Sequence, residues 1–583
     1  MRSLVPALAA LVAMSATALA APAADVVTLS IVTTTDLHGN IAPRGDQGGL
    51  ALFGGYLANL RAARAADGGA VLLVDSGDTF QGGIESDLSE GAVVVDAYAA
   101  LGYTAAVIGN HEFDFGAADG PGARQLRGAD PRGAIQARAA QAPYPVLAAN
   151  LLDDATGRVV AWPNVRPSAL VTAAGVKIGI VGLTTSEALR ATLRANVHGL
   201  RVAPLLETVV AEAAQLRTAG ARVVIVVAHA GGACAELGDP QDLSSCEAGS
   251  EIFALANGLP RGLVDVIAAG HTHQAVAHEV AGIAIVQAYA LGRAFGRVDL
   301  ALDRRSHEVV AREIFAPRDI CAVAAEPGEC GAPGGAGTAA QPARYEGQAV
   351  VPDPAIEAAM APALARVRAL QATPLGVLLD TPIARGGPRE AALRNPESPL
   401  GNLFADAERE RTGADVAINN NVRGGLRADL PEGPLTFGRL YDVFPFDNRL
   451  VTLAMSGAEL RALLEDEVRR NRPGSLGLSG IRARVGCKAA GALEVEVERP
   501  DGAPLGREER VVVAAMDSLV RGPVFSAVPH AGETDIPADA PVLREVVEDW
   551  LRARGGHLAA GELVQADRPR WQYAEDPTGC LTR

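Results

Sequence analysis

Five short polar clusters in the first half of this 583-residue sequence carry side chains that can ligate metal ions. They read TTTDLHGN, DSGDTFQG, GNHEFDFG, HAGG and GHTH, and they supply Asp36, His38, Asp75, Asp78, Asn110, His111, Glu112, Asp114, His229, His271 and His273. Aspartate, asparagine and histidine without cysteine suit zinc, manganese or iron better than calcium. The set is too large for one tetrahedral ion and large enough for two. Two ions about 3.5–4 Å apart are the usual solution for displacement at phosphorus.

Each of these clusters follows an apolar run that is typical of a buried strand. The runs are 26–32, 71–74, 105–108, 222–228 and 264–268. Taken singly the signals are weak, because Asp36 could cap a helix, His229 could be a core imidazole and Asn110 could form a turn. All five clusters nevertheless come after a strand and none before one. Because the carboxyl ends of strands in an α/β fold face one crevice, we expect the clusters to meet there.

The elements that position these clusters indicate an α/β fold. From residue 26 to about 300, apolar β-branched runs alternate with Ala-rich helical stretches. Continuous apolar strands suit sheets that are covered on both faces, which predicts an α/β sandwich. Residues 317–350 are rich in Gly, Pro and Ala and are predicted to be a linker between a domain at 25–316 and a second at 351–583. A helix at about 353–371 is expected to open the second domain.

The first residues predict export from the cytoplasm. Arg2, the apolar run 4–14 and the small-residue motif at 18–20 indicate a signal peptide over residues 1–20. An N-terminal membrane anchor is the alternative, but the apolar run is shorter than the ~20 residues that a spanning helix needs. The C-terminal sequence has no apolar tail, which disfavours a lipid anchor. We therefore expect a periplasmic or secreted protein without a stable membrane anchor.

The cysteine content and the net charge further restrict the class of protein. In an oxidising compartment the six cysteines are expected to form disulfides rather than a thiolate metal site. Pairing of nearest neighbours, one of many possible connectivities, would join Cys234–Cys246, Cys321–Cys330 and Cys487–Cys580. The net charge of −16 disfavours nucleic-acid binding, which needs a basic surface. Nothing in the sequence predicts an oligomeric state.

The order DxH…GDxxxG…GNHExD…H…GHTH resembles the calcineurin-like metallophosphoesterases and, more narrowly, the secreted 5′-nucleotidase family. The resemblance implies an αββα-sandwich catalytic domain followed by a smaller α/β substrate-binding domain. It implies two divalent ions, zinc or manganese, with the ligands Asp36, His38 and His273 for one, Asn110, His229 and His271 for the other, and Asp78 as the bridge. His111 and Asp114 resemble the catalytic dyad of the family, whereas Asp75 and Glu112 are expected to be structural.

The resemblance extends to motifs in the second half that would bind the nucleoside. LRNPESPLGN (393–402) and the block 418–451 imply contacts from Arg394, Asn419, Arg423, Arg427 and Phe446. The Asn–Gly–Gly motif is longer here than in the family. The glycine-rich turn that precedes the second stacking aromatic is replaced by SLVRGPVF, which makes Phe525 the candidate for that ring. Stacking on one ring contributes about 1–3 kcal/mol, so a single ring would bind purine and pyrimidine bases alike.

The function that these features predict is hydrolysis of nucleoside 5′-monophosphates to nucleoside and phosphate outside the cytoplasm. The alternatives are a 2′,3′-cyclic-nucleotide phosphodiesterase with 3′-nucleotidase activity, a UDP-sugar diphosphatase, and a nucleotide-binding protein without catalysis. Because the catalytic and recognition groups lie on different domains, we also expect a hinge motion around the 350–372 helix to gate turnover.

Overall fold

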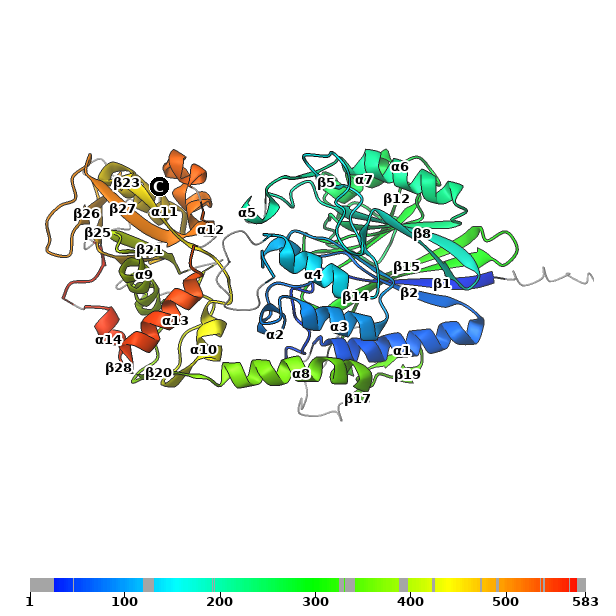
Figure 1. Ribbon diagram of the computed structural model, residues 1–583, viewed down its shortest axis with the longest axis horizontal. Helices are drawn as coiled ribbons and strands as arrows, with labels where there is room; N and C mark the ends of the chain where they lie inside the picture. The colour runs from blue at the N-terminus through cyan, green and yellow to red at the C-terminus, as the bar shows by residue number, and fades with distance from the viewer. Residues whose placement is uncertain are drawn as a thin grey trace, which may run out of the picture.

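The structure is a computed structural model with two α/β lobes that lie side by side (Figure 1). It describes residues 26–45, 47–118, 130–190, 192, 194–324, 330, 341–386, 397–421, 425–471, 474–488, 492–534, 536–537, 540–565 and 567–573. The predicted signal peptide, Arg394, Arg423 and Cys580 lie outside these residues. The two-domain α/β architecture expected from the sequence is confirmed.

The first lobe is built from two sheets packed face to face. One sheet has the order β15 (Val309–Asp319), β14 (Ala294–Asp303), β1 (Val26–Thr34), β2 (Ala70–Asp75), β3 (Ala105–Val107), β4 (Val146–Leu147) and β6 (Val165–Arg166). The other has the order β12 (Ala275–Val280), β13 (Ile283–Ala288), β11 (Val266–Ala268), β10 (Val223–His229), β8 (Val176–Thr184) and β7 (Ser168–Ala173). A short pair, β5 (Leu151–Asp153) and β9 (Leu200–Val202), lies beside them.

Helices cover the outer faces of both sheets, which makes the lobe a four-layer αββα sandwich (Figure 1). Residues of α1 (Leu50–Asp67) and α3 (Ala92–Leu101) form one outer core, and those of α6 (Leu205–Thr218) and α7 (Glu251–Gly258) form the other. The shorter helices are α2 (Ile84–Asp87), α4 (Gly133–Gln141) and α5 (Arg194–Val197). Every residue of β10 is buried, because one face of it packs between the sheets and the other under a helix. This double coverage explains why the strand sequences are continuously apolar.

The central strands of the two sheets are parallel, which brings their carboxyl ends to one edge. β1, β2, β3 and β4 pair in parallel in one sheet, and β8, β10, β11 and β13 do so in the other. The five polar clusters follow β1, β2, β3, β10 and β11. The topology therefore places all of them at the same end of the sandwich.

The described residues of the segment 317–350 pack against the first lobe rather than forming a free connection. β15 continues to Asp319, and two short pairs follow: β16 (Val323–Ala324) with β17 (Gln341–Pro342), and β18 (Arg344–Tyr345) with β19 (Gln348–Ala349). The ring of Tyr345 lies 5.3 Å from that of Tyr56 and 5.6 Å from that of Phe295. Burial of this aromatic ring holds the segment on the sandwich.

The predicted helix after this segment is confirmed as α8 (Pro354–Gln371), which runs beneath the first lobe and ends at the second (Figure 1). Asp353 caps it by accepting a hydrogen bond from the backbone of Ala355 at 2.8 Å. Ile356 and Met360 belong to the core of the first lobe, whereas Val367 belongs to the core of the second. The helix is thus shared between the two cores, and the hinge expected there stays a prediction.

The second lobe surrounds one large apolar cluster with three small sheets. Their orders are β23 (Leu450–Ser456), β27 (Arg510–Met516), β21 (Val416–Asn420), β24 (Leu476–Ser479); β22 (Gly433–Thr436), β20 (Pro374–Leu379), β28 (Gly556–Leu558); and β26 (Leu493–Glu498), β25 (Arg482–Cys487), β29 (Trp571–Tyr573). The helices are α9 (Pro399–Thr412), α10 (Phe437–Val443), α11 (Gly457–Asn471), α12 (Asp517–Val520), α13 (Leu543–Arg554) and α14 (Ala560–Leu563).

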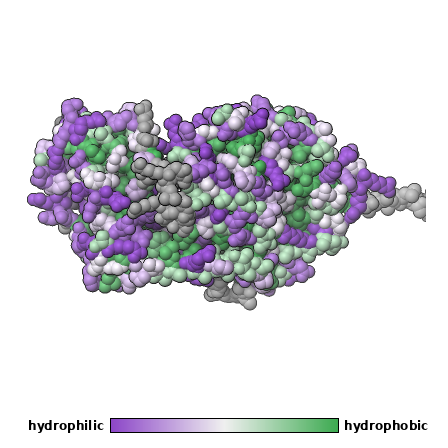
Figure 2. Space-filling view, in the orientation of Figure 1, coloured by the Kyte–Doolittle hydropathy of each residue, from purple (hydrophilic) through white to green (hydrophobic). Residues whose placement is uncertain are grey.

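Two of the three predicted disulfides, Cys234–Cys246 and Cys321–Cys330, are present. Cys487 is also disulfide-bonded, and Cys580 lies outside the described residues. Among the described helices, none combines the length and the apolar character needed to cross a bilayer. Hydrophilic and apolar residues are interspersed over both lobes on the face shown in Figure 2.

Candidate metal centre

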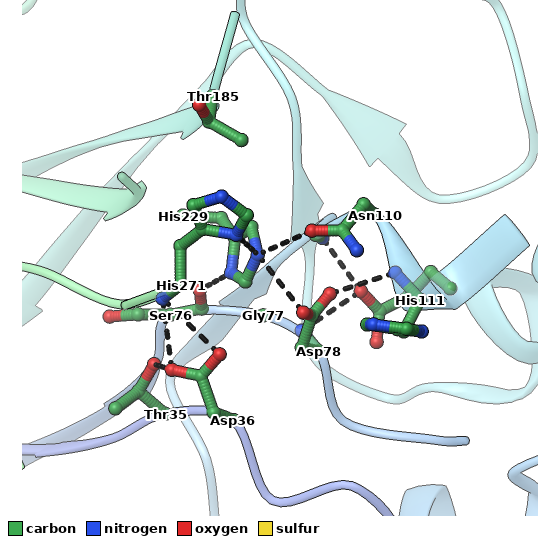
Figure 3. A network of polar contacts seen from close by, with 12 residues as sticks. Thr35, Asp36, Ser76, Gly77, Asp78, Asn110, His111, Thr185, His229 and His271 are labelled. Carbon is green, nitrogen blue, oxygen red and sulfur yellow. Dashed lines mark hydrogen bonds and ion pairs between the residues drawn. The ribbon is translucent and has the colours of Figure 1, made fainter. Parts of the chain in front are cut away.

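Candidate ligands from all five strand ends come together in three overlapping groups at the edge of the sandwich. Figure 3 labels Asp36, Asp78, Asn110, His111, His229 and His271 among them. Asp36, His38 and His273 form the first group, Asp78, His229 and His271 form the second, and His38, Asp78 and His111 form a third that joins them. Within each group the potential ligand atoms lie within 4.8 Å of one another. The predicted convergence of the clusters is therefore present in the structure.

In the first group, the ring nitrogens face each other and a carboxylate. The Nε2 atoms of His38 and His273 are 3.1 Å apart, and Nε2 of His273 lies 3.4 Å from Oδ1 of Asp36. The other ring nitrogen of His38, Nδ1, donates a hydrogen bond to the carbonyl of Gln81 at 2.9 Å. That bond leaves Nε2 of the neutral imidazole without a proton and directs its lone pair into the group.

In the second group, three potential ligand atoms surround Nε2 of His229. This nitrogen lies 3.1 Å from Oδ1 of Asn110, 3.1 Å from Nδ1 of His271 and 3.2 Å from Oδ2 of Asp78. Nδ1 of His229 donates to the carbonyl of Ser76 at 2.8 Å, so Nε2 again points inward without a proton when the ring is neutral. Four buried or half-buried atoms with lone pairs thus converge on one point, as they do around a divalent cation.

Asp78 lies between the two groups. Its Oδ2 atom is 3.2 Å from Nε2 of His229 and 4.0 Å from Nε2 of His38, and its side chain is almost completely buried. Its Oδ1 atom accepts a hydrogen bond from the backbone nitrogen of His111 at 2.8 Å. A carboxylate in this place can contribute to both groups. The donor set fits a pair of divalent ions, because nitrogen and carboxylate oxygen ligands are present in two groups that share one neighbour.

The loops that carry the candidate ligands adopt an unusual backbone conformation. Five of the ligands have positive φ angles: Asp36 (50°), His38 (48°), Asp78 (55°), His271 (78°) and His273 (57°). Such angles cost about 1–3 kcal/mol for residues other than glycine, and they persist where the surroundings enforce them. Backbone hydrogen bonds from Asp36 to Gly77 and from His38 to Asp78, both 2.9 Å long, join the first two loops. This conformation turns the chain sharply after β1, β2 and β11, where the side chains point back to the sheet edge.

Asp75 and Glu112, expected to be structural, accept hydrogen bonds that hold these loops. Glu112 accepts from the backbone nitrogens of Gly109, Asp78 and Thr79 at 2.6–3.0 Å. Asp75 accepts from four groups, those of Thr34, Gly77, Thr79 and Tyr98. Burial raises the pKa of Asp75 to about 6, and burial together with the charge of Asp78 raises the pKa of Glu112 to about 7.

His111 and Asp114 form a close pair beside the metal groups. The three-residue 3₁₀ helix His111–Phe113 follows the third cluster, and Nδ1 of His111 lies 2.5 Å from Oδ2 of Asp114. Burial disfavours the charged ring, but the carboxylates of Asp114 and Asp78 outweigh it and raise the pKa of His111 to about 10. The imidazole is therefore protonated at neutral pH in this arrangement, and its Nε2–H is the group available to a ligand.

The pair faces a cleft of about 390 Å³ between the two lobes. The first lobe contributes Gln81, His111, Asp114, Arg190 and Thr192, and the second contributes Phe446, Asp447, Asn448, Arg449, Asp517, Ser518 and Arg521. Most of these residues were not among the site residues predicted from the sequence. Asp517 could have been found by the strand-end argument, since it directly follows β27, which is parallel to β21.

The predicted base-binding residues are only partly brought to this cleft. Phe446 is half-buried and lines it, and the guanidinium of the exposed Arg427 lies 4.7 Å from the centre of its ring. Asn419 is fully buried within β21. Phe525 is only 1% exposed and belongs to the core of the second lobe, so the prediction that it stacks on a base is wrong. Its apolar ring is used for packing and presents no free face.

Comparisons with known proteins agree with this architecture. Residues 29–275 match the calcineurin-like phosphoesterase family, and residues 376–524 match the 5′-nucleotidase C-terminal domain. The chain is 26% identical to the 5′-nucleotidase of Vibrio cholerae over 453 residues, which is 74% of each protein. It is 26% identical over 591 residues to the cell wall protein Lmo0130 of Listeria monocytogenes, covering 94% of this chain and 69% of that one.

The fold is similar to that of a putative 5′-nucleotidase from Staphylococcus aureus, with a TM-score of 0.64 at 16% identity, over 94% of this chain and 99% of that one. Both domains and their order are those of one family. The chain belongs to the 5′-nucleotidase family, in which a calcineurin-like phosphoesterase domain precedes a 5′-nucleotidase C-terminal domain, and it is a metal-dependent phosphoester hydrolase.

Proposed function

We propose that this protein hydrolyses nucleoside 5′-monophosphates to nucleoside and phosphate with two divalent ions, zinc or manganese. The observation that carries the proposal is the pair of ligand groups on either side of Asp78, next to His111 and a cleft between the domains. Asp36, His38 and His273 would hold one ion, and Asn110, His229 and His271 the other. When bound, such ions bind phosphoryl oxygens and lower the pKa of a water molecule that can attack phosphorus.

The contribution of His111 follows from its charge and position. The carboxylates of Asp114 and Asp78 favour the protonated form of its ring, and Asp114 fixes the ring by accepting from Nδ1. The Nε2–H can then donate a hydrogen bond to a phosphoryl oxygen or transfer its proton to the departing ribose oxygen. Acid–base assistance of this kind contributes about 10²- to 10⁴-fold in rate.

The second domain would recognise the nucleoside. Phe446 offers one aromatic ring in the cleft, and Arg427 lies over that ring. Because Phe525 is buried, the base would stack on one ring, that of Phe446. A site of this kind accepts purine and pyrimidine nucleotides alike. The similarity to the Vibrio cholerae 5′-nucleotidase supports the choice of 5′-monophosphates among phosphoesters.

We propose that the reaction takes place outside the cytoplasm. Two disulfides in the described residues, Cys234–Cys246 and Cys321–Cys330, support an oxidising compartment. The sequence motif for a signal peptide over residues 1–20 supports the same location. The similarity to a Listeria monocytogenes protein named for the cell wall agrees with it.

The test is phosphate release from a panel of AMP, 3′-AMP, 2′,3′-cyclic AMP, ATP and UDP-glucose, each with and without a chelator. The proposal predicts the highest kcat/KM with AMP and loss of activity after metal removal, with recovery on adding zinc or manganese. Equal or better turnover of the cyclic nucleotide or of UDP-glucose would contradict the assignment of 5′-monophosphates as the substrate. Unchanged activity in an exhaustively metal-stripped sample would refute the mechanism.

A further inference from the structure

A path of three hydrogen bonds connects the second domain to the candidate metal ligand His38. Nδ1 of His38 donates to the carbonyl of Gln81 at 2.9 Å. The N–H of the same peptide unit, on Gly82, donates to Oδ1 of Asp87 at 2.9 Å. The other carboxylate oxygen, Oδ2, accepts a hydrogen bond from the hydroxyl of Tyr441. Asp87 ends α2 in the first domain, whereas Tyr441 lies on α10 in the second.

The groups along this path are buried and closely packed. Asp87 is 6% exposed and Tyr441 3% exposed. A Cβ atom at position 82 would lie 3.0 Å from the carbonyl oxygen of His38, so the peptide chain there touches His38 directly. Ile84, on α2, belongs to the apolar core of the second domain. The segment from Gln81 to Asp87 is thus held between the metal loop and the second domain.

On the side of the second domain, the same tyrosine is connected to the wall of the cleft. The guanidinium of Arg544 lies 4.6 Å from the centre of the Tyr441 ring. Arg544 also donates to the carbonyl of Phe446 at 3.0 Å and to Oδ1 of Asp447 at 2.6 Å. Phe446 and Asp447 both line the cleft. The contacts therefore run without interruption from the backbone of Phe446, in the wall of the cleft, to the metal group.

We propose that Asp87 and Tyr441 are positioning residues for His38, through which docking of the second domain strengthens metal binding in the first. An oxygen that accepts from the N–H of a peptide unit, as Oδ1 of Asp87 does, polarises that unit and makes its carbonyl a better acceptor. The partner of a metal-ligating histidine fixes the ring and raises its basicity, and loss of such a partner costs about 10- to 100-fold in metal affinity. The proposal rests on the proposed function, because it requires His38 to be a ligand.

The experiment measures binding of Co²⁺ to the metal-stripped full-length protein, together with the visible absorption spectrum of the bound cobalt. Asp87→Leu removes the acceptor for the Gly82 N–H and is expected to weaken cobalt binding about tenfold and to shift the spectrum. Tyr441→Phe is expected to act in the same direction by a smaller factor. Asp87→Asn keeps an oxygen acceptor for the Gly82 N–H and is expected to restore binding close to that of the wild type.

Two further variants make the outcome decisive. Tyr573→Phe removes another tyrosine hydroxyl of the second domain, one without a hydrogen-bond partner among the described residues, and should leave cobalt binding and the spectrum unchanged. His38→Ala should weaken cobalt binding more than Asp87→Leu does. If His38→Ala weakens binding but Asp87→Leu and Tyr441→Phe do not, the positioning role is refuted and the proposed metal site stands. If His38→Ala has no effect, the proposed metal site fails, and the positioning role fails with it.

Discussion

Replacement of His111 by alanine separates catalysis from metal binding. The substitution removes the imidazole that lies 2.5 Å from Asp114. It leaves the hydrogen bond from the backbone nitrogen of residue 111 to Oδ1 of Asp78, which is 2.8 Å long and does not involve the side chain. Asp78 therefore keeps its place between the two ligand groups. We expect His111→Ala to retain the metal content of the wild type.

The expected loss of rate follows from the role of the imidazolium. Removal of a general acid lowers the rate about 10²- to 10⁴-fold, which corresponds to about 3–5 kcal/mol of transition-state stabilisation. No other described cation lies within hydrogen-bond distance of Asp114 to replace the imidazolium. The loss should appear in kcat rather than in KM, because proton donation stabilises the transition state more than the bound substrate.

The assay is steady-state phosphate release from AMP, with metal content measured on the same samples by mass spectrometry. His557→Ala is the matched control, since His557 is an exposed histidine of the second domain that pairs with Asp380. The control should behave as the wild type. A His111→Ala enzyme with full metal content and a kcat within tenfold of the wild type would refute the assignment of His111.

The remaining predictions concern the metal bridge, the base site and the core. Asp78→Ala should abolish phosphate release and lower the metal content, because Oδ2 of Asp78 faces both ligand groups; full metal content would contradict the bridging role. Phe446→Ala should raise the KM for AMP about 5- to 150-fold and leave that for p-nitrophenyl phosphate, which has no base, nearly unchanged. Phe525→Ala should instead lower the free energy of unfolding by about 3–5 kcal/mol, as measured in urea. Burial, with no partner for the carboxyl group among the described residues, raises the pKa of Glu408 well above 4.5, so the folded protein keeps a proton that the unfolded chain releases. Stability should therefore fall as the pH rises above about 4.5. Glu408→Leu should remove this dependence and raise the free energy of unfolding at pH 7 by about 1–3 kcal/mol. Identical pH dependence in the variant would contradict the buried, protonated state.

The strand-end clusters could be predicted because they depend on local and topological rules. Apolar runs such as 222–228 are buried on both faces. Parallel pairing within each sheet and packing of the two sheets bring His229, at the end of β10, to Asp78, which follows β2 in the other sheet. The positive φ angles of Asp36, His38 and Asp78 could not be predicted, because Asp and His adopt this conformation more often than most residues but still only rarely, and the sequence does not show which of them will do so. The surrounding loops impose it.

The second domain was less predictable for a physical reason. An aromatic residue has the same apolar surface whether it packs in a core or lines a cleft, so Phe525 and Phe446 look alike in the sequence. Tertiary packing decides between them, and it buries Phe525 while leaving Phe446 half-buried in the cleft. The contact between Asp87 and Tyr441 is equally invisible, since it joins residues 354 positions apart.

Anomalous X-ray scattering from crystals grown with zinc or manganese tests the metal pair most directly. Data collected on both sides of the absorption edge should show two peaks about 3.5–4 Å apart. One should lie among Asp36, His38 and His273, the other among Asn110, His229 and His271, with Asp78 between them. A single peak, or peaks away from these side chains in a protein that still hydrolyses AMP, would contradict the account.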